Sequence, residues 1–147
     1  MFMGEYHHNI DEKGRLTLPS KFRENLGSKF IVTRGLENCL FVYTLESWKK
    51  IANRLESLPF TKKDARNFSR FFLSGATVLE FDKQGRINLT AALIKYASLT
   101  KECVIIGVGD RLEIWDFKKW NDFFNNSLSA LSETAENLFN NEMEVSL

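Results

Sequence analysis

The feature that most constrains the fold of this chain is an internal duplication. The run DEKGRLTL at residues 11–18 recurs as DKQGRINL at residues 82–89, with the Asp, the Gly, the Arg and the last Leu unchanged. Further along the chain the offset between matching positions rises from 71 to 72 residues, through a one-residue insertion. Matches that keep their order over about 45 residues indicate a duplicated structural unit. We therefore predict repeats at residues 5–50 and 76–121, a helical connector at 51–75 and a C-terminal helical segment at 122–147.

Both repeats predict the same order of elements. A short strand leads to the Asp, and Gly14 or Gly85 then supplies the positive φ of a tight hairpin turn. A second strand, a helix of one or two turns and two strands rich in β-branched and aromatic residues follow. In the connector, Thr61 and Asp64 have the spacing of a capping box for a helix over 62–73. The predicted strands are 5–10, 15–18, 29–34, 38–43, 76–81, 86–89, 102–107 and 111–115.

Neither repeat is long enough to be an independent domain. A unit of about 45 residues buries too little surface to be stable alone. We therefore expect the two repeats to share one core, as the two chains of a homodimer would, around a pseudo-two-fold axis. The sequence predicts a single α+β unit rather than two separate domains.

Motifs of catalysis and metal binding are missing from the sequence. It contains no nucleophile elbow and no phosphate-binding glycine loop. His7 and His8 are adjacent, so on a strand they point to opposite faces and cannot bind one ion together. Cys39 and Cys103 lack ligand spacing and are interpreted as core thiols. We predict no enzymatic activity, no metal or other cofactor, and no small-molecule substrate.

The N-terminus has neither the basic flank nor the apolar run of a signal peptide. No stretch approaches the roughly 20 apolar residues of a membrane span. We therefore expect a cytoplasmic protein with no membrane partner.

The repeated Asp-x-x-x-Arg motif has two interpretations. In the structural one, Asp11 and Asp82 accept backbone hydrogen bonds across their turns and pair with Arg15 and Arg86. In the functional one, two equivalent turns present their arginines to neighbouring positions on a DNA duplex. A guanidinium suits this role because it binds a phosphate or a guanine edge through two hydrogen bonds. The residue types alone leave both interpretations open.

Charge is distributed unevenly along the chain. The formal net charge of +1 argues against a protein that coats nucleic acid indiscriminately. Residues 1–75 hold 13 Lys or Arg and 8 Asp or Glu, which gives +5, while residues 76–147 hold 7 and 11, which gives −4. Lys13, Lys21 and Arg23 lie in the first repeat. If one repeat meets phosphate, this distribution predicts the first.

With these features the chain resembles the MraZ family. The resemblance covers residues 1–125 and includes the doubled Asp-x-x-x-Arg motif. The matching runs are FMGEY at 2–6, DxxGRLTLP at 11–19, SGA at 74–76, DxQGRI at 82–87 and GxGxRLEIW at 107–115.

The resemblance implies two tandem SpoVT/AbrB-like domains, each a β-hairpin with a helix, that form one pseudo-two-fold, β-barrel-like unit with flanking helices. It implies a transcriptional regulator of the division and cell wall gene cluster, located in the cytoplasm at the nucleoid. Such a protein binds short direct repeats in the promoter of its own operon and assembles into a homo-oligomeric ring.

The DNA-contacting arginine of the family carries over to Arg15 and, by repeat equivalence, to Arg86. Their basic neighbours in the first repeat are further candidates, and the helices around Trp48, Phe68 and Phe72 are candidate subunit contacts. The expected DNA-binding residues are Arg15, Arg86, Lys13, Lys21 and Arg23, and the expected structural residues of the motif are Asp11, Gly14, Asp82 and Gly85.

Two other functions remain open at this stage. The first is an AbrB-like antitoxin, which usually carries one such module and a toxin-binding tail. The second is an assembly or scaffold protein, in which the Asp and Arg residues form only a structural pair.

Overall fold

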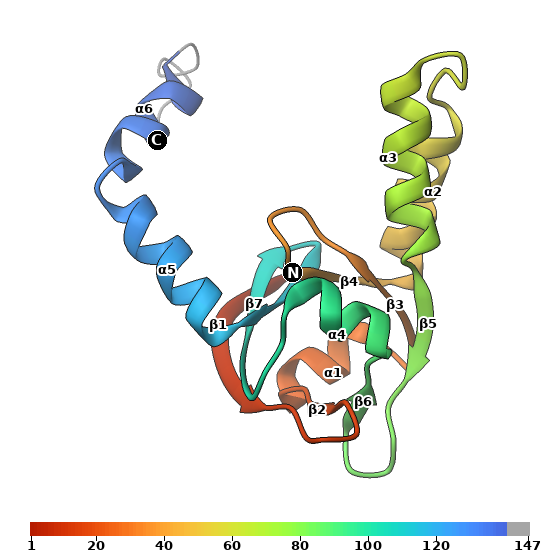
Figure 1. Cartoon of the computed structure of the whole chain (residues 1–147), viewed down its shortest axis with the longest axis vertical. Coiled ribbons are helices and arrows are strands. Elements are labelled where there is room, and N and C mark those ends of the chain that lie inside the picture. Colours follow the sequence, from red (N-terminus) through yellow and green to blue (C-terminus); the bar gives the residue numbers. More distant parts are fainter. Residues whose placement is uncertain (141–147) are drawn as a thin grey trace. The chain divides into compact units, whose positions relative to one another are not determined.

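The computed structural model describes residues 1–140 and arranges them as eight strands and six helices (Figure 1). The chain divides into two compact units, Met1–Phe117 and a C-terminal unit that begins at Lys118. The last part of the predicted C-terminal segment, residues 141–147, lies outside the described residues.

The elements follow each other in the predicted order. Up to residue 74 they are β1 (Phe2–Asn9), β2 (Arg15–Thr17), α1 (Ser20–Leu26), β3 (Lys29–Arg34), β4 (Leu40–Thr44), α2 (Leu45–Glu56) and α3 (Lys63–Ser74). They continue as β5 (Thr77–Glu80), β6 (Arg86–Asn88), α4 (Ala91–Ala97), β7 (Glu102–Gly109), β8 (Arg111–Asp116), α5 (Phe117–Leu128) and α6 (Leu131–Phe139).

The two repeats exchange strands within one antiparallel sheet. Its order is β1-β7-β8-β4-β3-β5. Repeat-equivalent strands stand at equal distances from the two edges, so the sheet has pseudo-two-fold symmetry. β4 and β8 pair at the centre, while β1 pairs with β7 and β5 with β3, so each outer strand is held by the other repeat. β2 and β6 form a separate two-stranded ladder. Every one of these pairings joins the two halves of the chain.

The predicted local hairpins are therefore wrong, although the predicted turns form. β1 and β2 are joined only by an isolated bridge between Ile10 and Leu16. β1 pairs with β7 along its full length instead, from Phe2 opposite Gly109 to Asn9 opposite Glu102. An eight-residue ladder satisfies many more backbone groups than the three-residue strand β2 offers, so the longer partner prevails.

The sheet is open, so the barrel-like closure expected from the resemblance is not formed. Among residues 1–140 no pairing joins the edge strands β1 and β5. The β2–β6 ladder and the short helices α1 and α4 pack against the sheet instead. Their buried side chains belong to the same core as the buried side chains of the six-stranded sheet. The central members of this core are Leu16, Phe22, Phe30, Leu40, Ile87, Leu93, Ile105 and Ile114. The prediction that both repeats share one core is confirmed.

Helix boundaries follow the sequence closely, and the helix predicted over 62–73 is α3, Lys63–Ser74. Pro19 precedes α1 and Gly27 follows it, while at the position equivalent to Pro19, Thr90 caps α4 by accepting a hydrogen bond from Leu93 N at 3.2 Å. The predicted capping box of α3 is not formed. That helix begins only at Lys63, and its N-cap residue Lys62 makes no side-chain capping bond.

Both cysteines are buried and unpaired, as the sequence predicts. Burial is the main cause that raises the pKa of both thiols, to about 12 for Cys103. A search of the described helices finds none with the length and apolar character needed to cross a membrane.

Gly107 allows the close approach of β1 to β7. A Cβ built on Gly107 would collide with the backbone of Phe2 and Met3. We expect Gly107→Ala to lower the free energy of unfolding by about 1–3 kcal/mol through overpacking. Urea unfolding would measure this, with Val108→Ala on the same strand as a control that should change stability little. Equal stability of the two variants would contradict the assigned strand exchange.

Candidate functional site

The first Asp-x-x-x-Arg turn is organised by the carboxylate of Asp11. Its Oδ1 accepts hydrogen bonds from the backbone N–H groups of Lys13 at 2.9 Å and Arg15 at 2.8 Å. Its Oδ2 accepts a hydrogen bond from the side-chain Nε of Arg15 at 2.7 Å. Gly14, at φ 81°, closes the turn by donating to the backbone oxygen of Asp11. The structural interpretation of the motif is therefore present in the first repeat.

The second turn repeats this arrangement around Asp82. Oδ1 accepts from the backbone N–H groups of Gln84 at 2.8 Å and Arg86 at 2.9 Å, and Oδ2 accepts from Arg86 Nε at 2.8 Å. Gly85, at φ 75°, closes the turn on the backbone oxygen of Asp82. Identical bonding in both repeats shows that the sequence match reflects one local structure used twice.

These bonds stabilise the ionised carboxylates. The backbone N–H of Arg15 is the largest cause that holds the pKa of Asp11 below its ordinary value, followed among the favourable causes by the Arg15 side chain. The backbone and side chain of Arg86 lower the pKa of Asp82 in the same way. Both turns are therefore more stable with ionised than with protonated Asp residues.

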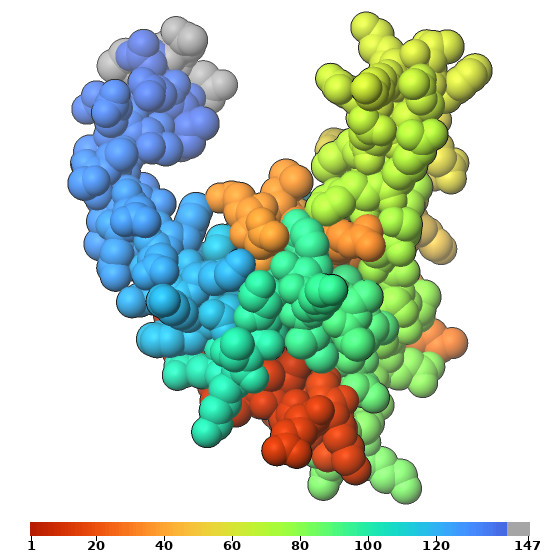
Figure 2. Space-filling view, in the orientation of Figure 1, coloured from red at the N-terminus to blue at the C-terminus, as the bar shows by residue number. Residues whose placement is uncertain are grey.

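The two turns are held side by side by bonds between the repeats. Leu89 N donates to the backbone oxygen of Gly14 at 2.9 Å, and Leu18 N donates to that of Gly85 at 3.4 Å. Between them, the β2–β6 ladder places Leu16 opposite Ile87. Both turns consequently protrude from the same end of the unit formed by residues 1–117, away from α2 and α3 (Figures 1 and 2).

Each short helix covers the turn of the other repeat. Arg23 of α1 lies over Gly85, where an added Cβ would come within 2.8 Å of its guanidinium carbon, and it donates a hydrogen bond to the backbone oxygen of Leu18. Ile94 of α4 occupies the equivalent place over Gly14. Strand exchange thus brings a positive charge of the first repeat to the turn of the second.

This placement changes how charge is distributed over the site. The first turn carries Asp11, Glu12, Lys13 and Arg15, which balance each other. The second turn carries only one acidic residue, because Lys83 stands where the first repeat has Glu12, and Arg23 adds to it. The sequence had indicated the first repeat as the more basic one; at the turns themselves the second is more basic.

The remaining candidate residues are accessible. Lys13 and Lys21 are exposed, and so is Lys83, which sequence reasoning had not singled out. The reversal of charge from Glu12 in the first repeat to Lys83 at the aligned position of the second could have identified this residue. The side chains of Arg15 and Arg86 remain 34% and 26% exposed while they pair with their aspartates.

The remaining titratable side chains include one cluster around His7. Among residues 1–140 no group of three or more His, Cys, Asp or Glu side chains is placed to hold a metal ion. His7 contacts the carboxylates of Glu5 at 2.9 Å and Glu102 at 2.8 Å through its two ring nitrogens. These hydrogen bonds raise the pKa of His7, with that to Glu5 the largest cause.

Aromatic side chains of α2 and α3 stack on each other within the chain. Phe72 is buried, and the rings of Trp48 and Phe68 each stack on it with centroids 5.5 Å away. Phe72 is therefore part of the packing between α2 and α3, and it is not available as a surface for another subunit.

Comparison with protein families matches both repeats. The model of a family described as "MraZ protein, putative antitoxin-like" matches residues 1–71 and, a second time, residues 72–142. Each match contains one Asp-x-x-x-Arg turn, so the duplication seen in the sequence is a duplication of one family domain.

From the lowered pKa values of the two turn carboxylates we predict that acid reduces the stability of the fold. Because their pKa values in the folded protein lie below the ordinary value of 3.8, they stabilise the fold above that value and lose this contribution as the pH falls through their lowered pKa. We expect the double variant Asp11→Asn, Asp82→Asn to be less stable at neutral pH and to lose less stability on acidification.

Urea unfolding at several pH values between neutrality and the acid range measures this difference. Glu12→Gln, next to Asp11 but outside its hydrogen bonds, serves as the control and should keep the wild-type pH profile. Parallel profiles for the wild type and the double variant would show that the turns do not depend on ionised aspartates.

Proposed function

The chain belongs to the MraZ family, and from this premise we propose that it is a sequence-specific DNA-binding transcriptional regulator. In this proposal it acts in the cytoplasm at the nucleoid and binds short direct repeats in the promoter of its own operon, within the division and cell wall gene cluster. It binds as a ring-shaped homo-oligomer, and no catalytic step is involved.

The observation that carries the proposal is the pair of arginine-bearing turns held side by side. Their equivalent geometry and their opposition across the β2–β6 ladder give one rigid surface with two related recognition points. A pseudo-two-fold surface of this kind suits a duplex, whose phosphates repeat along two strands.

The Asp–Arg pairs are compatible with DNA binding because they use only part of each guanidinium. The pairs engage Nε of Arg15 and of Arg86. Within residues 1–140 no hydrogen bond engages the terminal Nη groups of either arginine. The aspartate therefore orients the guanidinium in advance, and its two Nη groups remain as donors to a phosphate or to O6 and N7 of guanine.

The surrounding cations would supply affinity that does not depend on sequence. Lys13 and Lys83 are exposed within the turns and Lys21 is exposed near the start of α1, and each phosphate contact releases counterions. One module with so few contacts binds weakly. Several modules in one ring would engage successive operator repeats at a high effective concentration.

The first test separates DNA contact from turn structure. We expect Arg15→Ala to abolish binding to the region upstream of the chain's own gene, since each lost bidentate contact weakens recognition by about 1–3 kcal/mol in every module. Asp11→Asn removes the other half of the same ion pair but keeps the turn acceptor. We expect it to weaken DNA binding less than Arg15→Ala does, because the guanidinium remains and only its orientation by the aspartate is lost.

Fluorescence anisotropy with operator and scrambled duplexes measures both variants, and circular dichroism checks their fold. If the motif is only a structural pair, as in a scaffold protein, the two variants will not differ in their affinity for operator DNA. Operator affinity unaffected by Arg15→Ala would refute the proposed role.

The second test concerns the charge that strand exchange delivers to the second turn. Arg23→Ile places on α1 the residue type that α4 has at the equivalent position, so packing over the turn is retained. We expect the slope of log K against log salt to become shallower by about 0.9 for each subunit that contacts DNA. Arg54→Ile, on exposed α2 away from the turns, is the control with the same change in net charge. Equal slopes for these two variants would place Arg23 outside the interface.

A second candidate function follows from the words "antitoxin-like" in the description of the family model. In that case the chain would also bind a small toxin protein. Co-purification of such a protein with the full chain would favour this function, whereas salt-dependent operator binding by the chain alone favours the regulator.

A further inference from the structure

We propose that Asn88 is a specificity-determining residue of the DNA site, and that its side-chain amide reads an adenine beside the contact point of Arg15. The inference rests on the proposed function, because it assigns a base to a residue on the same surface. Sequence reasoning had not singled out Asn88.

The first observation is the outward face of the β2–β6 ladder. Leu16 and Ile87, at its middle, are fully buried, so the residues on either side of them point the other way. The outward face carries Arg15 and Thr17 from β2 and Arg86 and Asn88 from β6. A two-stranded ribbon of this kind fits the major groove of a duplex, where every base pair presents a distinct pattern of donors and acceptors.

The second observation is the place of Asn88 within this face. Asn88 is directly opposite Arg15 in the register of the ladder. Side chains in such a pair lie on one face, with Cβ atoms about 4.5–5.5 Å apart. Successive bases of one DNA strand are about 3.4 Å apart, so these two neighbours can reach adjoining base pairs. The Asn88 Oδ1 also lies 3.4 Å from the place of a Cβ built on Gly14, which puts the amide against the first turn.

The amide of Asn88 is available to a ligand. Asn88 is exposed, and within residues 1–140 its side chain takes part in no hydrogen bond. An asparagine amide offers both a donor and an acceptor, and it matches N7 and the N6 amino group of adenine through two hydrogen bonds. The side chain is short and stands on a paired strand, so little freedom is lost when it binds.

The two repeats differ at this position. Thr17 stands where the second repeat has Asn88, because each is the second residue after the arginine of its turn. A threonine hydroxyl can donate or accept, and it therefore distinguishes bases poorly. The pseudo-two-fold face thus has an adenine-reading amide at one end only. This difference gives the bound element a direction, as direct repeats require, whereas a fully symmetric face would favour a palindrome.

A second amide, that of Gln84, lies near this face. Gln84 is at the tip of the second turn, where its backbone N–H donates to Asp82. Its side chain is longer than that of Asn88 and stands on a turn rather than on a strand, so its position is less fixed. We therefore assign the adenine contact to Asn88, and Gln84 provides a test of the alternative.

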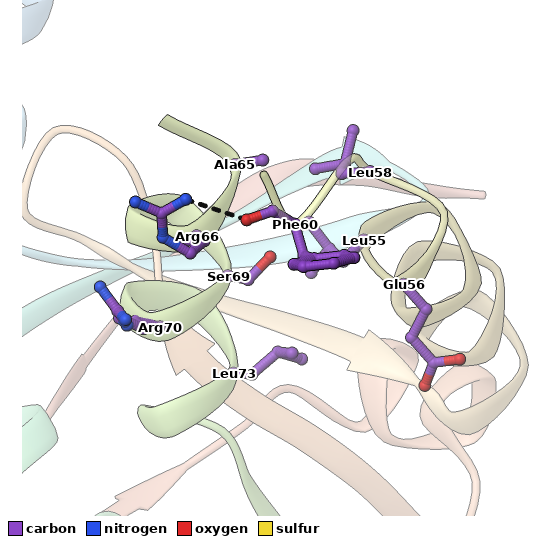
Figure 3. Close-up of a pocket in the computed structure, with 9 residues that line it drawn as sticks. All are labelled: Leu55, Glu56, Leu58, Phe60, Ala65, Arg66, Ser69, Arg70 and Leu73. Carbon is purple, nitrogen blue, oxygen red and sulfur yellow. Dashed lines mark hydrogen bonds between the residues drawn. The ribbon is translucent and has the colours of Figure 1, made fainter. Parts of the chain in front are cut away.

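The ladder is remote from the helical arm formed by α2 and α3. The arm projects away from both turns, and the cavity of about 340 Å³ between its helices is lined mainly by apolar side chains, including Leu55, Phe60 and Leu73 (Figures 1 and 3). Asn53 is exposed on α2. The arm therefore offers the same residue type as Asn88 for a matched control away from the turns.

The test measures the base preferences of the full chain. Competition binding uses duplexes from the region upstream of the chain's own gene, each with one base pair replaced. We expect the wild type to prefer A·T at one position by about 10-fold, the discrimination of one bidentate contact. Asn88→Thr, which introduces a residue that suits a strand, should lose this preference and keep those at other base pairs. Thr17→Asn should gain a second A·T preference at the symmetry-related position.

Asn53→Thr makes the same substitution on the helical arm and should keep every wild-type preference. Unchanged preferences in Asn88→Thr, an equal loss of affinity for operator and scrambled duplexes, or loss of the A·T preference in Gln84→Ala would each overturn the proposal. If circular dichroism shows that Asn88→Thr does not fold, Thr17→Asn decides alone, and without the gained preference the proposal fails. Failure of the proposed function appears separately, as operator affinity unaffected by Arg15→Ala.

Discussion

Backbone pairing between the repeats is the constraint on which the rest of the structure depends. Within residues 1–140 the outer strands β1 and β5 pair only with β7 and β3 of the other repeat, and the sheet centre is the pairing of β4 with β8. Pairing within a repeat is confined to the β3–β4 and β7–β8 hairpins of this sheet. Because each repeat completes the other, the apolar residues of both form one core, and the duplication folds as a fused pseudo-dimer.

The same exchange decides where the charged residues act. The turns are local structures, each built by one aspartate that accepts two backbone hydrogen bonds and one from an arginine. Their placement side by side is a long-range effect of the β2–β6 ladder and of the bonds from Leu18 and Leu89. Arg23 belongs to the first repeat by sequence and to the second turn by contact. A composite surface of this kind is an expected result of fusing two swapped units, because the elements that cover a turn come from its partner.

Prediction from sequence succeeded where the physics is local. Gly14 and Gly85 were assigned positive φ because a tight turn requires it, and both have it. Element order, the helix after Pro19 and the buried cysteines were also correct. The predicted hairpins were wrong because the side-chain pattern of a strand indicates that the strand belongs to a sheet but does not identify its partner strand. The capping box at Thr61 failed because α3 begins one residue later than the spacing suggested, so that Lys62 and not Thr61 is its N-cap residue.

The sequence by itself determined the repeat, the Asp-x-x-x-Arg turns and the family, because these depend on residue type and spacing over a few positions. Only the tertiary structure decided which strands exchange, that the sheet stays open, and that Arg23 of the first repeat lies at the turn of the second. These properties depend on which distant segments meet, and residue spacing along one chain does not encode that choice.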